Sequence, residues 1–171
     1  FGGIESASIL EPVMRVAQLT GDDEALAFAR YIVSSGCCKR ENIFAAIRSG
    51  KSPYRIGDNG NPKESIAKAY EMMSCFEGLI EYYRVTGIEK HRIAAENFVT
   101  ALCDTEDTII GCLGCKGENF DNATVTQAND EHSLYMQETC VTVTWMKLCL
   151  QMYRLTGKIE YIEHIEKSYY N

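Results

Sequence analysis

Hydrophobic and polar residues follow each other with helical spacing along this chain, and the pattern recurs as three similar phrases. Each phrase is an apolar amphipathic run, a Thr-Gly stop and a second amphipathic run: VMRVAQLTGDDEALAFARYIV (13–33), LIEYYRVTGIEKHRIAAENFV (79–99) and CLQMYRLTGKIEYIEHIEKSYYN (149–171). Their glycines, at 21, 87 and 157, lie 66 and 70 residues apart. Because a repeated phrase defines the building block of a fold, the chain is predicted to consist of helical hairpins.

The same spacing predicts where the helices lie. We expect helices from Ser6 or Ser8 to Gly21, then over 22–34, 64–85, 89–103 and 141–155, and from 159 onward. Pro12 fits the first helix only if that helix begins near Leu10, since proline is tolerated in a first turn. The turn formers over 49–62 predict a long exposed loop, and 104–137 reads as irregular with a β-like run at 108–110.

Three hairpins of this length predict an all-α fold in which residues 1–171 form part of an (α/α)6 toroid. The repeat is much longer than the 34 residues of a TPR or the 40–47 residues of a HEAT repeat. A complete toroid of six hairpins needs about twice this chain, so a fragment of a larger catalytic domain is expected. Unpaired hairpin faces would then favour self-association.

Composition narrows the possible partners. The 171 residues carry a formal net charge of −7, with 46% hydrophobic and 24% charged residues. A nucleic acid or an anionic membrane surface requires clustered Lys and Arg, so neither is expected as a partner. The chain contains no run of eighteen apolar residues that would predict a membrane span. The sequence assigns no compartment.

Eight cysteines divide into two groups by their surroundings. Cys75, Cys103 and Cys149 lie in apolar helical patterns, where a thiol is typically a small core hydrophobe. The other five lie at element ends or in loops, where chemistry is more common. Among these, Cys112 and Cys115 form a CxxC pair that would need two more zinc ligands, for which Cys140 and His132 are available; a redox pair or chance spacing explains it equally well.

The sharpest local signal is Glu138-Thr139-Cys140, at the start of a predicted helix. Residues two apart do not share a face of a continuous helix, but they converge on one point in an extended entry to it. Carboxylate oxygen and thiolate sulfur both ligate zinc, and the helix N-terminus favours a thiolate. The alternative is an acid placed for the helix dipole, followed by a buried cysteine.

Three phrases, GGIESASILEP, YEMMSCFEGLIEYYRVTG and ETCVTVTWMKLCLQMYRLTGKIEYIEHIEKSYYN, resemble the β-L-arabinofuranosidase family of glycoside hydrolases. The resemblance covers nearly the whole chain and implies an (α/α)6 toroid acting on plant-type glycans. In that family a zinc ion is held by a glutamate, a cysteine two residues later and two adjacent cysteines, one of which is the nucleophile. Glu138 and Cys140 match the first two ligands, and Glu118 matches the general acid/base of a retaining mechanism.

The resemblance also carries departures. The family's nucleophilic Cys-Cys phrase normally follows the Tyr-Asn ending, so the chain ending at Asn171 is expected to be inactive alone; the pair Cys37-Cys38 precedes the motif and is a poor substitute. Ser8 and Lys68 stand where histidines of the sugar pocket are expected. Of the histidines present, His91 and His164 are expected to be solvated, and His132 lies near Glu138 in sequence.

Two other classes of function stay open at this level. One is a non-catalytic helical-repeat binding module, in which Glu138-Thr139-Cys140 is structural and no zinc binds. The other is a different (α/α)6 enzyme, such as a lyase or epimerase, that would recruit Tyr70, Tyr135 or Arg84.

Overall fold

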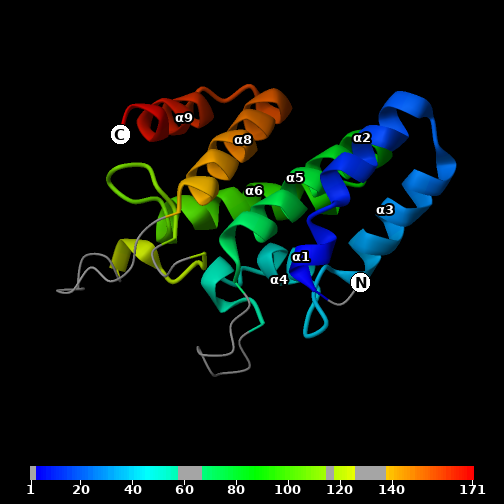
Figure 1. Cartoon of the computed structure of the whole chain (residues 1–171), viewed down its shortest axis with the longest axis horizontal. Helices are drawn as coiled ribbons and strands as arrows, with labels where there is room; N and C mark the ends of the chain where they lie inside the picture. The colour runs from blue at the N-terminus through cyan, green and yellow to red at the C-terminus, as the bar shows by residue number, and fades with distance from the viewer. Residues whose placement is uncertain (1–2, 58–66, 115–117, 126–137) are drawn as a thin grey trace.

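The computed structural model describes residues 3–57, 67–114, 118–125 and 138–171, and these form helices joined by turns (Figure 1). The helices are α1 (Ile4–Ala7), α2 (Leu10–Thr20), α3 (Asp23–Ser35), α4 (Ile43–Arg48), the 3-10 helix η1 (Pro53–Arg55), α5 (Ala69–Thr86), α6 (Glu89–Thr105), α8 (Thr139–Thr156) and α9 (Glu160–Tyr170). No strand occurs among these residues; the only β-type pairing they contain is the isolated bridge between Lys68 and Asn119. The all-α prediction is confirmed.

The predicted hairpins are α2–α3, α5–α6 and α8–α9, and their first helices pack side by side. Helix α5 contacts both α2 and α8, so α2, α5 and α8 form one row (Figure 1). Each second helix packs on the first helix of its own hairpin, and α4 lies against α6. Helical hairpins whose first helices pack in a row are the arrangement expected of part of an α/α toroid.

The three Thr-Gly stops have the same geometry. The hydroxyls of Thr20, Thr86 and Thr156 donate to the carbonyl four residues earlier at 2.7, 2.8 and 2.8 Å. Each hydroxyl also accepts from the backbone N–H two residues later, at 3.3, 3.5 and 3.3 Å. The glycine after each threonine has a positive φ of 71°, 66° or 74°, which ends the helix in the left-handed conformation that glycine adopts without strain. The repeat in the sequence is therefore a repeated turn.

Several predicted boundaries are confirmed and others are wrong. Helix α2 begins at Leu10, which places Pro12 in its first turn, and the Asp22 side chain caps α3 by accepting from two backbone N–H groups. The region predicted as an exposed loop contains η1, whose Pro53 is buried, and α4 precedes it unpredicted. The run at 108–110 is a turn closed by hydrogen bonds between Thr108 and Cys112, because Gly111 has a positive φ.

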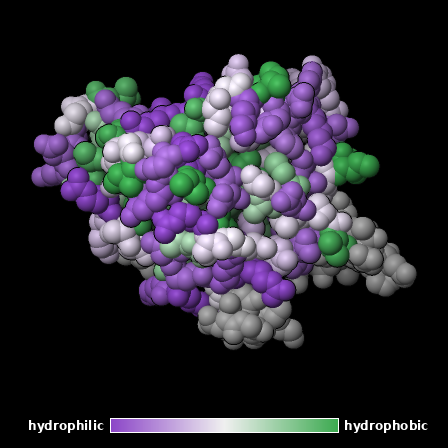
Figure 2. Space-filling model, turned by 180° about the vertical axis from the view of Figure 1, so that it is seen from behind, coloured by the Kyte–Doolittle hydropathy of each residue, from purple (hydrophilic) through white to green (hydrophobic). Residues whose placement is uncertain are grey.

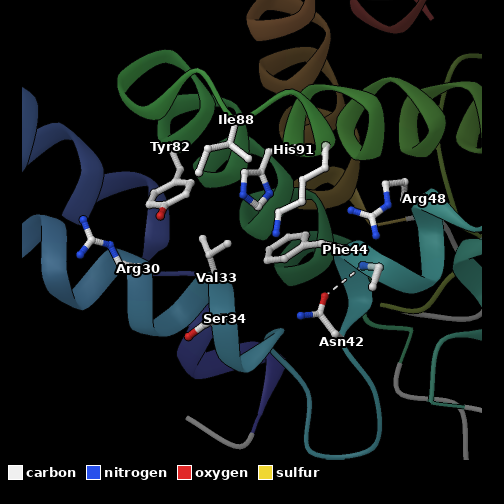
Figure 3. Close-up of a pocket in the computed structure, with 11 residues that line it drawn as sticks. Arg30, Val33, Ser34, Asn42, Phe44, Arg48, Tyr82, Ile88 and His91 are labelled. Carbon is white, nitrogen blue, oxygen red and sulfur yellow. Dashed lines mark hydrogen bonds between the residues drawn. The ribbon is translucent and has the colours of Figure 1, made fainter.

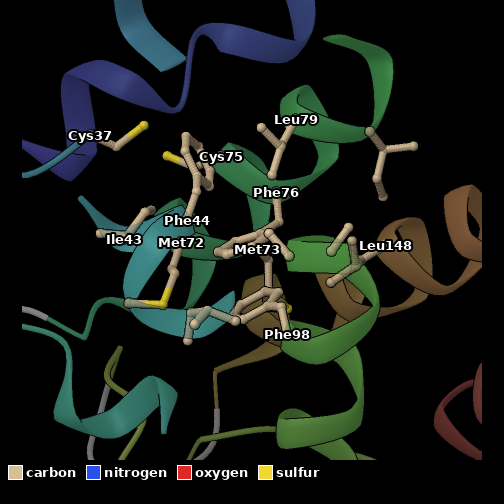
Figure 4. Close-up of a cluster of buried hydrophobic side chains, with 14 of the residues drawn as sticks. Cys37, Ile43, Phe44, Met72, Met73, Cys75, Phe76, Leu79, Phe98 and Leu148 are labelled. Carbon is tan, nitrogen blue, oxygen red and sulfur yellow. The ribbon is translucent and has the colours of Figure 1, made fainter. Parts of the chain in front are cut away.

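The core lies between the two rows of helices and is centred on aromatic rings (Figure 4). Phe76 of α5 stacks on Phe98 of α6 with ring centroids 3.9 Å apart, and Phe44 of α4 meets Phe76 edge-on at 5.2 Å. Cys75 and Cys149 are buried in this core, as predicted, whereas Cys103 is only half-buried. Helix α4 therefore contributes to the core, although the sequence shows no helical periodicity over its residues.

A polar seam joins the first helices of the three hairpins. Glu81 of α5 is fully buried, accepts from Gln18 of α2 at 2.9 Å and pairs with Arg15 at 3.2 Å and with Arg84. Arg84 in turn donates to Gln151 of α8 at 2.9 Å. Because a buried carboxylate is costly unless it is paired, these contacts fix the neighbouring helices in one register.

Exposed apolar side chains are distributed over several parts of the surface. On the face shown in Figure 2, apolar residues occur in small groups separated by hydrophilic ones. The large apolar side chains with the highest exposed fractions include Leu19, Ile109, Tyr169 and Tyr170. None of the helices in the described ranges is both long and apolar enough to cross a membrane. Association through unpaired hairpin faces stays a prediction.

Candidate functional site

Glu138 and Cys140 meet at the entry to α8. Glu138 is the N-cap residue with an extended backbone (φ −82°, ψ 134°), and its side chain makes no capping hydrogen bond. Its Oε2 instead accepts from the Cys140 thiol at 3.1 Å. The convergence predicted from the extended entry is confirmed, although the thiol is exposed rather than buried as the alternative required.

The electrostatics of this pair suit a cation. Local desolvation of the thiol and then the Glu138 carboxylate raise the pKa of Cys140, because both disfavour a second negative charge. A divalent cation between the two groups would reverse that preference. Oxygen and sulfur are donors that zinc accepts. Within the described ranges no group of three or more His, Cys, Asp or Glu side chains is placed to hold a metal ion.

Glu118 lies at a different helix entry, beside the start of α5. The backbone N–H of Ala69 donates to the Glu118 carbonyl at 2.8 Å, and Phe120 donates back to the carbonyl of Ala67 at 2.8 Å. The Phe120 ring is buried and meets Phe98 edge-on at 6.2 Å. These contacts pin the segment that carries Glu118 to the core.

A buried carboxylate holds the same segment from its other end. Glu106, fully buried after α6, accepts from the backbone N–H groups of Asn122 at 2.8 Å, Ala123 at 3.2 Å and Asp121 at 3.4 Å. Burial raises the pKa of Glu106 to about 7, although the three N–H groups favour its ionised form. Sequence reasoning missed this residue, because nothing in the pattern shows that an acid at a helix end points inward.

Lys68 is the immediate partner of Glu118. Its Nζ lies 3.3 Å from Glu118 Oε1 and 3.4 Å from Glu5 Oε1, and the hydrogen bond to Glu118 raises the pKa of Lys68. Ser8, the other residue expected at a histidine position, donates to the carbonyl of Glu5 at 2.7 Å. The Glu118 side chain is 49% exposed, so the described residues do not desolvate it.

Glu118 and the pair Glu138–Cys140 lie at the entries to two different helices, α5 and α8. No hydrogen bond or ion pair within the described residues joins Glu118 to Glu138 or Cys140. The predicted participants Cys115, His132 and Tyr135 lie outside the described residues. The roles of Glu118, Glu138 and Cys140 remain predictions.

Two residues named for a lyase or epimerase are described. Arg84 pairs with Glu81 and donates to Gln151, so it is part of the polar seam. Tyr70 lies in the first turn of α5 and is 41% exposed. An arginine held this way joins α5 to α8 rather than meeting a substrate, so the geometry does not favour that class.

The expectation that His91 and His164 are solvated is wrong. His91 is buried at the start of α6 against the Tyr82 ring, at 5.3 Å between centroids. His164 on α9 pairs with Asp107, its Nδ1 lying 3.0 Å from Oδ2, and its Nε2 lies 3.5 Å from the Cys103 sulfur. The sequence pattern marks both as polar-face positions, but Tyr82 of the same hairpin packs on His91, and α6 of the neighbouring hairpin covers most of His164.

A cavity of about 400 Å³ opens between α3, α4 and the start of α6, around His91 (Figure 3). Arg30, Arg48 and Lys90 line it, and no acidic side chain does so among the described residues. Burial, and then Lys90 and Arg48, lower the pKa of His91. A lining with this charge suits an anion more than a neutral sugar, and it shares no residue with the site at α5 and α8.

The paired helical hairpins define the class of protein as part of an α/α toroid, and comparisons with known proteins agree. A structure titled as a GH127 β-L-arabinofuranosidase from Geobacillus stearothermophilus T6 superposes with a TM-score of 0.66 and 15% identity. It is matched over 95% of this chain and 27% of its own. A second structure, titled as a GH127 β-arabinofuranosidase, has a TM-score of 0.61 and 14% identity over 93% of this chain and 24% of its own.

A family model identifies the family directly. The GH127 catalytic domain of β-L-arabinofuranosidases matches residues 3–171, so the chain belongs to this family. None of the curated proteins matches the chain. The chain spans about a quarter of the length of the structures it resembles.

Proposed function

We propose that this chain is part of the catalytic domain of a zinc-dependent, retaining β-L-arabinofuranosidase that acts on plant-type glycans. Membership of the glycoside hydrolase family supports the reaction class. The observation that supports the proposed zinc ligands is the contact of 3.1 Å between Glu138 Oε2 and Cys140 Sγ. Glu138 is the N-cap residue of α8 but makes no capping hydrogen bond, and its carboxylate accepts from the thiol instead.

In this proposal Glu138 and Cys140 hold the zinc ion through one oxygen and one sulfur. Bound zinc would supply positive charge that keeps a coordinating thiol deprotonated at neutral pH. The present pair is suited to that charge, because the carboxylate and the exposed thiol disfavour joint ionisation without it. Four-coordinate zinc needs two further donors, which must come from outside the described residues.

Glu118 is proposed as the general acid/base. In a retaining mechanism such a carboxyl group first protonates the leaving glycosidic oxygen and then takes a proton from the attacking water. Its backbone is fixed to α5 by the bridge at Lys68 and Asn119, and Glu106 anchors the residues that follow. Lys68, at 3.3 Å, orients the carboxyl group.

The nucleophile is not assigned to any described residue. Cys37 and Cys38 are buried after α3, and Cys37 interacts with Cys75 in the core. They are therefore unsuited to meet a sugar.

The test is the zinc content of the protein that carries this sequence, with Cys140→Ser and Glu138→Gln beside a matched thiol control, Cys103→Ser. We expect one bound zinc in the unchanged protein and in Cys103→Ser. We expect at least about a hundredfold weaker zinc binding in the two site variants.

Zinc retained by Cys140→Ser would contradict the assignment of the ligands. Absence of zinc from the unchanged protein would favour the helical-repeat binding module, in which the pair at α8 is structural.

A further inference from the structure

A second cluster of reactive side chains lies between the outer helices α6 and α9. Cys103 near the end of α6 and His164 on α9 approach to 3.5 Å between Sγ and Nε2. The other ring nitrogen of His164, Nδ1, lies 3.0 Å from Asp107 Oδ2. The order thiol, imidazole, carboxylate is the one that activates nucleophilic cysteines in unrelated proteins. The cluster shares no residue with Glu118, Glu138 or Cys140.

Local structure explains why these residues meet. The end of α6 closes with the N–H groups of Glu106 and Asp107 both donating to the Leu102 carbonyl, at 2.8 and 2.9 Å, which turns Asp107 toward α9. Lys167, one turn after His164, places its Nζ 3.0 Å from Asp107 Oδ1. The Trp145 ring of α8 meets the imidazole edge-on at 5.4 Å. The ring is therefore held on three sides.

The charges of the cluster favour an imidazolium facing the sulfur. Burial by itself raises the pKa of Asp107, but hydrogen bonds from His164 and Lys167 outweigh it and leave the pKa below its ordinary value. The bond to Asp107, and then the contact with Cys103, raise the pKa of His164 to about 10. Both ring nitrogens of His164 then carry protons at neutral pH, so Nε2–H points to the sulfur as a donor.

The other titratable neighbours of Cys103 do not compete with His164. Cys149 of α8 and Tyr161 of α9 interact with it electrostatically. Burial raises the pKa of the Cys149 thiol and raises that of Tyr161 to about 12, so both are neutral at pH 7. The imidazolium is the charged group nearest the sulfur among the contacts described here.

We propose that Cys103 is a reactive thiol, activated by His164 with Asp107 as the positioning residue, and that it is a site of covalent modification by soft carbon electrophiles. An adjacent imidazolium stabilises the thiolate form, which is the nucleophile. With iodoacetamide, the sulfur forms a bond to the methylene carbon, the carbon–iodine bond breaks and iodide leaves. Cys103 is half-buried and the His164 side chain is 24% exposed, which leaves the cluster open to a small reagent.

The experiment is limited alkylation of the native protein by iodoacetamide, with each cysteine quantified by peptide mass spectrometry. We expect Cys103 to react about tenfold faster than N-acetylcysteine in the same solution at pH 7, with a rate ratio that grows as the pH falls from 8.5 to 6.5. His164→Gln should lower the Cys103 rate about tenfold and remove that pH dependence, whereas the matched control His91→Gln should leave both unchanged. Fully buried Cys75 reports folding, since it reacts only when the protein opens.

Two outcomes would overturn the proposal. One is slower reaction of Cys103 in the native protein than of N-acetylcysteine at every pH. The other is an unchanged Cys103 rate in a His164→Gln protein whose Cys75 stays protected. If Cys75 becomes reactive in that variant, the variant has lost its fold. The proposal is then tested by the rate ratio of the unchanged protein and by the pH dependence of that ratio.

Discussion

Two cysteines in this molecule each lie near a carboxylate, yet the two surroundings have opposite chemical consequences. At the entry to α8 the Glu138 carboxylate touches the Cys140 thiol directly, and local desolvation and then this carboxylate raise the pKa of Cys140. Between α6 and α9 the imidazole of His164 separates Asp107 from Cys103. Among the described residues no cationic side chain pairs with the first thiol and acid, whereas the second pair contains a cation in its own histidine. In our proposal, the group placed between a thiol and an acid therefore decides the reactivity of the thiol.

The largest expected effect is a loss of catalysis, and it is expected only for substitutions in the proposed catalytic region and not for those near α9. Under the proposed function, Glu118→Gln in the protein that carries this chain should lower kcat for sugar release about 10²–10⁴-fold, because the amide cannot transfer the proton. The matched control is Glu166→Gln on α9, an exposed acid, which should leave kcat unchanged. Sugar release and zinc content are measured together. An unchanged kcat in Glu118→Gln would remove this residue from the mechanism.

The second largest expected effect is on the stability of the protein, and it concerns the region between α6 and α9. Asp107→Ala removes the partner of His164 and Lys167, and should lower the free energy of unfolding by about 2 kcal/mol, since bonds to charged groups contribute about 1.5–3 kcal/mol each and the two cations regain some water. Cys140→Ser in zinc-free protein should change it by less than about 0.5 kcal/mol, because its side chain is exposed. Urea unfolding measures both. Equal losses would show that the two regions are equally structural.

The smallest effect is the pH dependence of stability. A histidine whose pKa rises from 6.5 to about 10 on folding stabilises the protein fully below pH 6.5, and this contribution is lost as the pH rises toward 10. Asp107, with a lowered pKa, contributes above its ordinary value of 3.8 and loses that contribution as the pH falls. The pair is thus most stabilising between about pH 4 and 6.5.

The measurement compares unfolding free energies of the unchanged protein and His164→Gln from pH 6 to pH 10. The difference between them should shrink by on the order of 1 kcal/mol across that range. A difference that stays constant would mean that His164 does not titrate against Asp107.

The hairpins could be predicted because their signals are local. Thr20, Thr86 and Thr156 each bond within their own turn, and the following glycine needs only the left-handed backbone. The contact between Glu138 and Cys140 was predictable for the same reason, since two residues at one helix entry determine it. Helix α4 was not, because a short helix has too few positions to show a period.

The remaining features depend on distant partners. Glu106 reads as an ordinary acid until the segment 121–123 folds over it, and His164 reads as a solvated histidine until α6 brings Cys103 and Asp107 to its two nitrogens. Glu81 becomes a buried junction only when α2 and α5 pack together.

The sequence by itself determined the all-α class, the three hairpins, their glycine stops and the family to which the chain belongs. Only the tertiary structure decided which polar residues are buried and which thiol meets a cation. The physical reason is range: helix periodicity and turn geometry involve neighbours a few residues apart, whereas burial and ionisation depend on side chains that the packing of separate hairpins brings together.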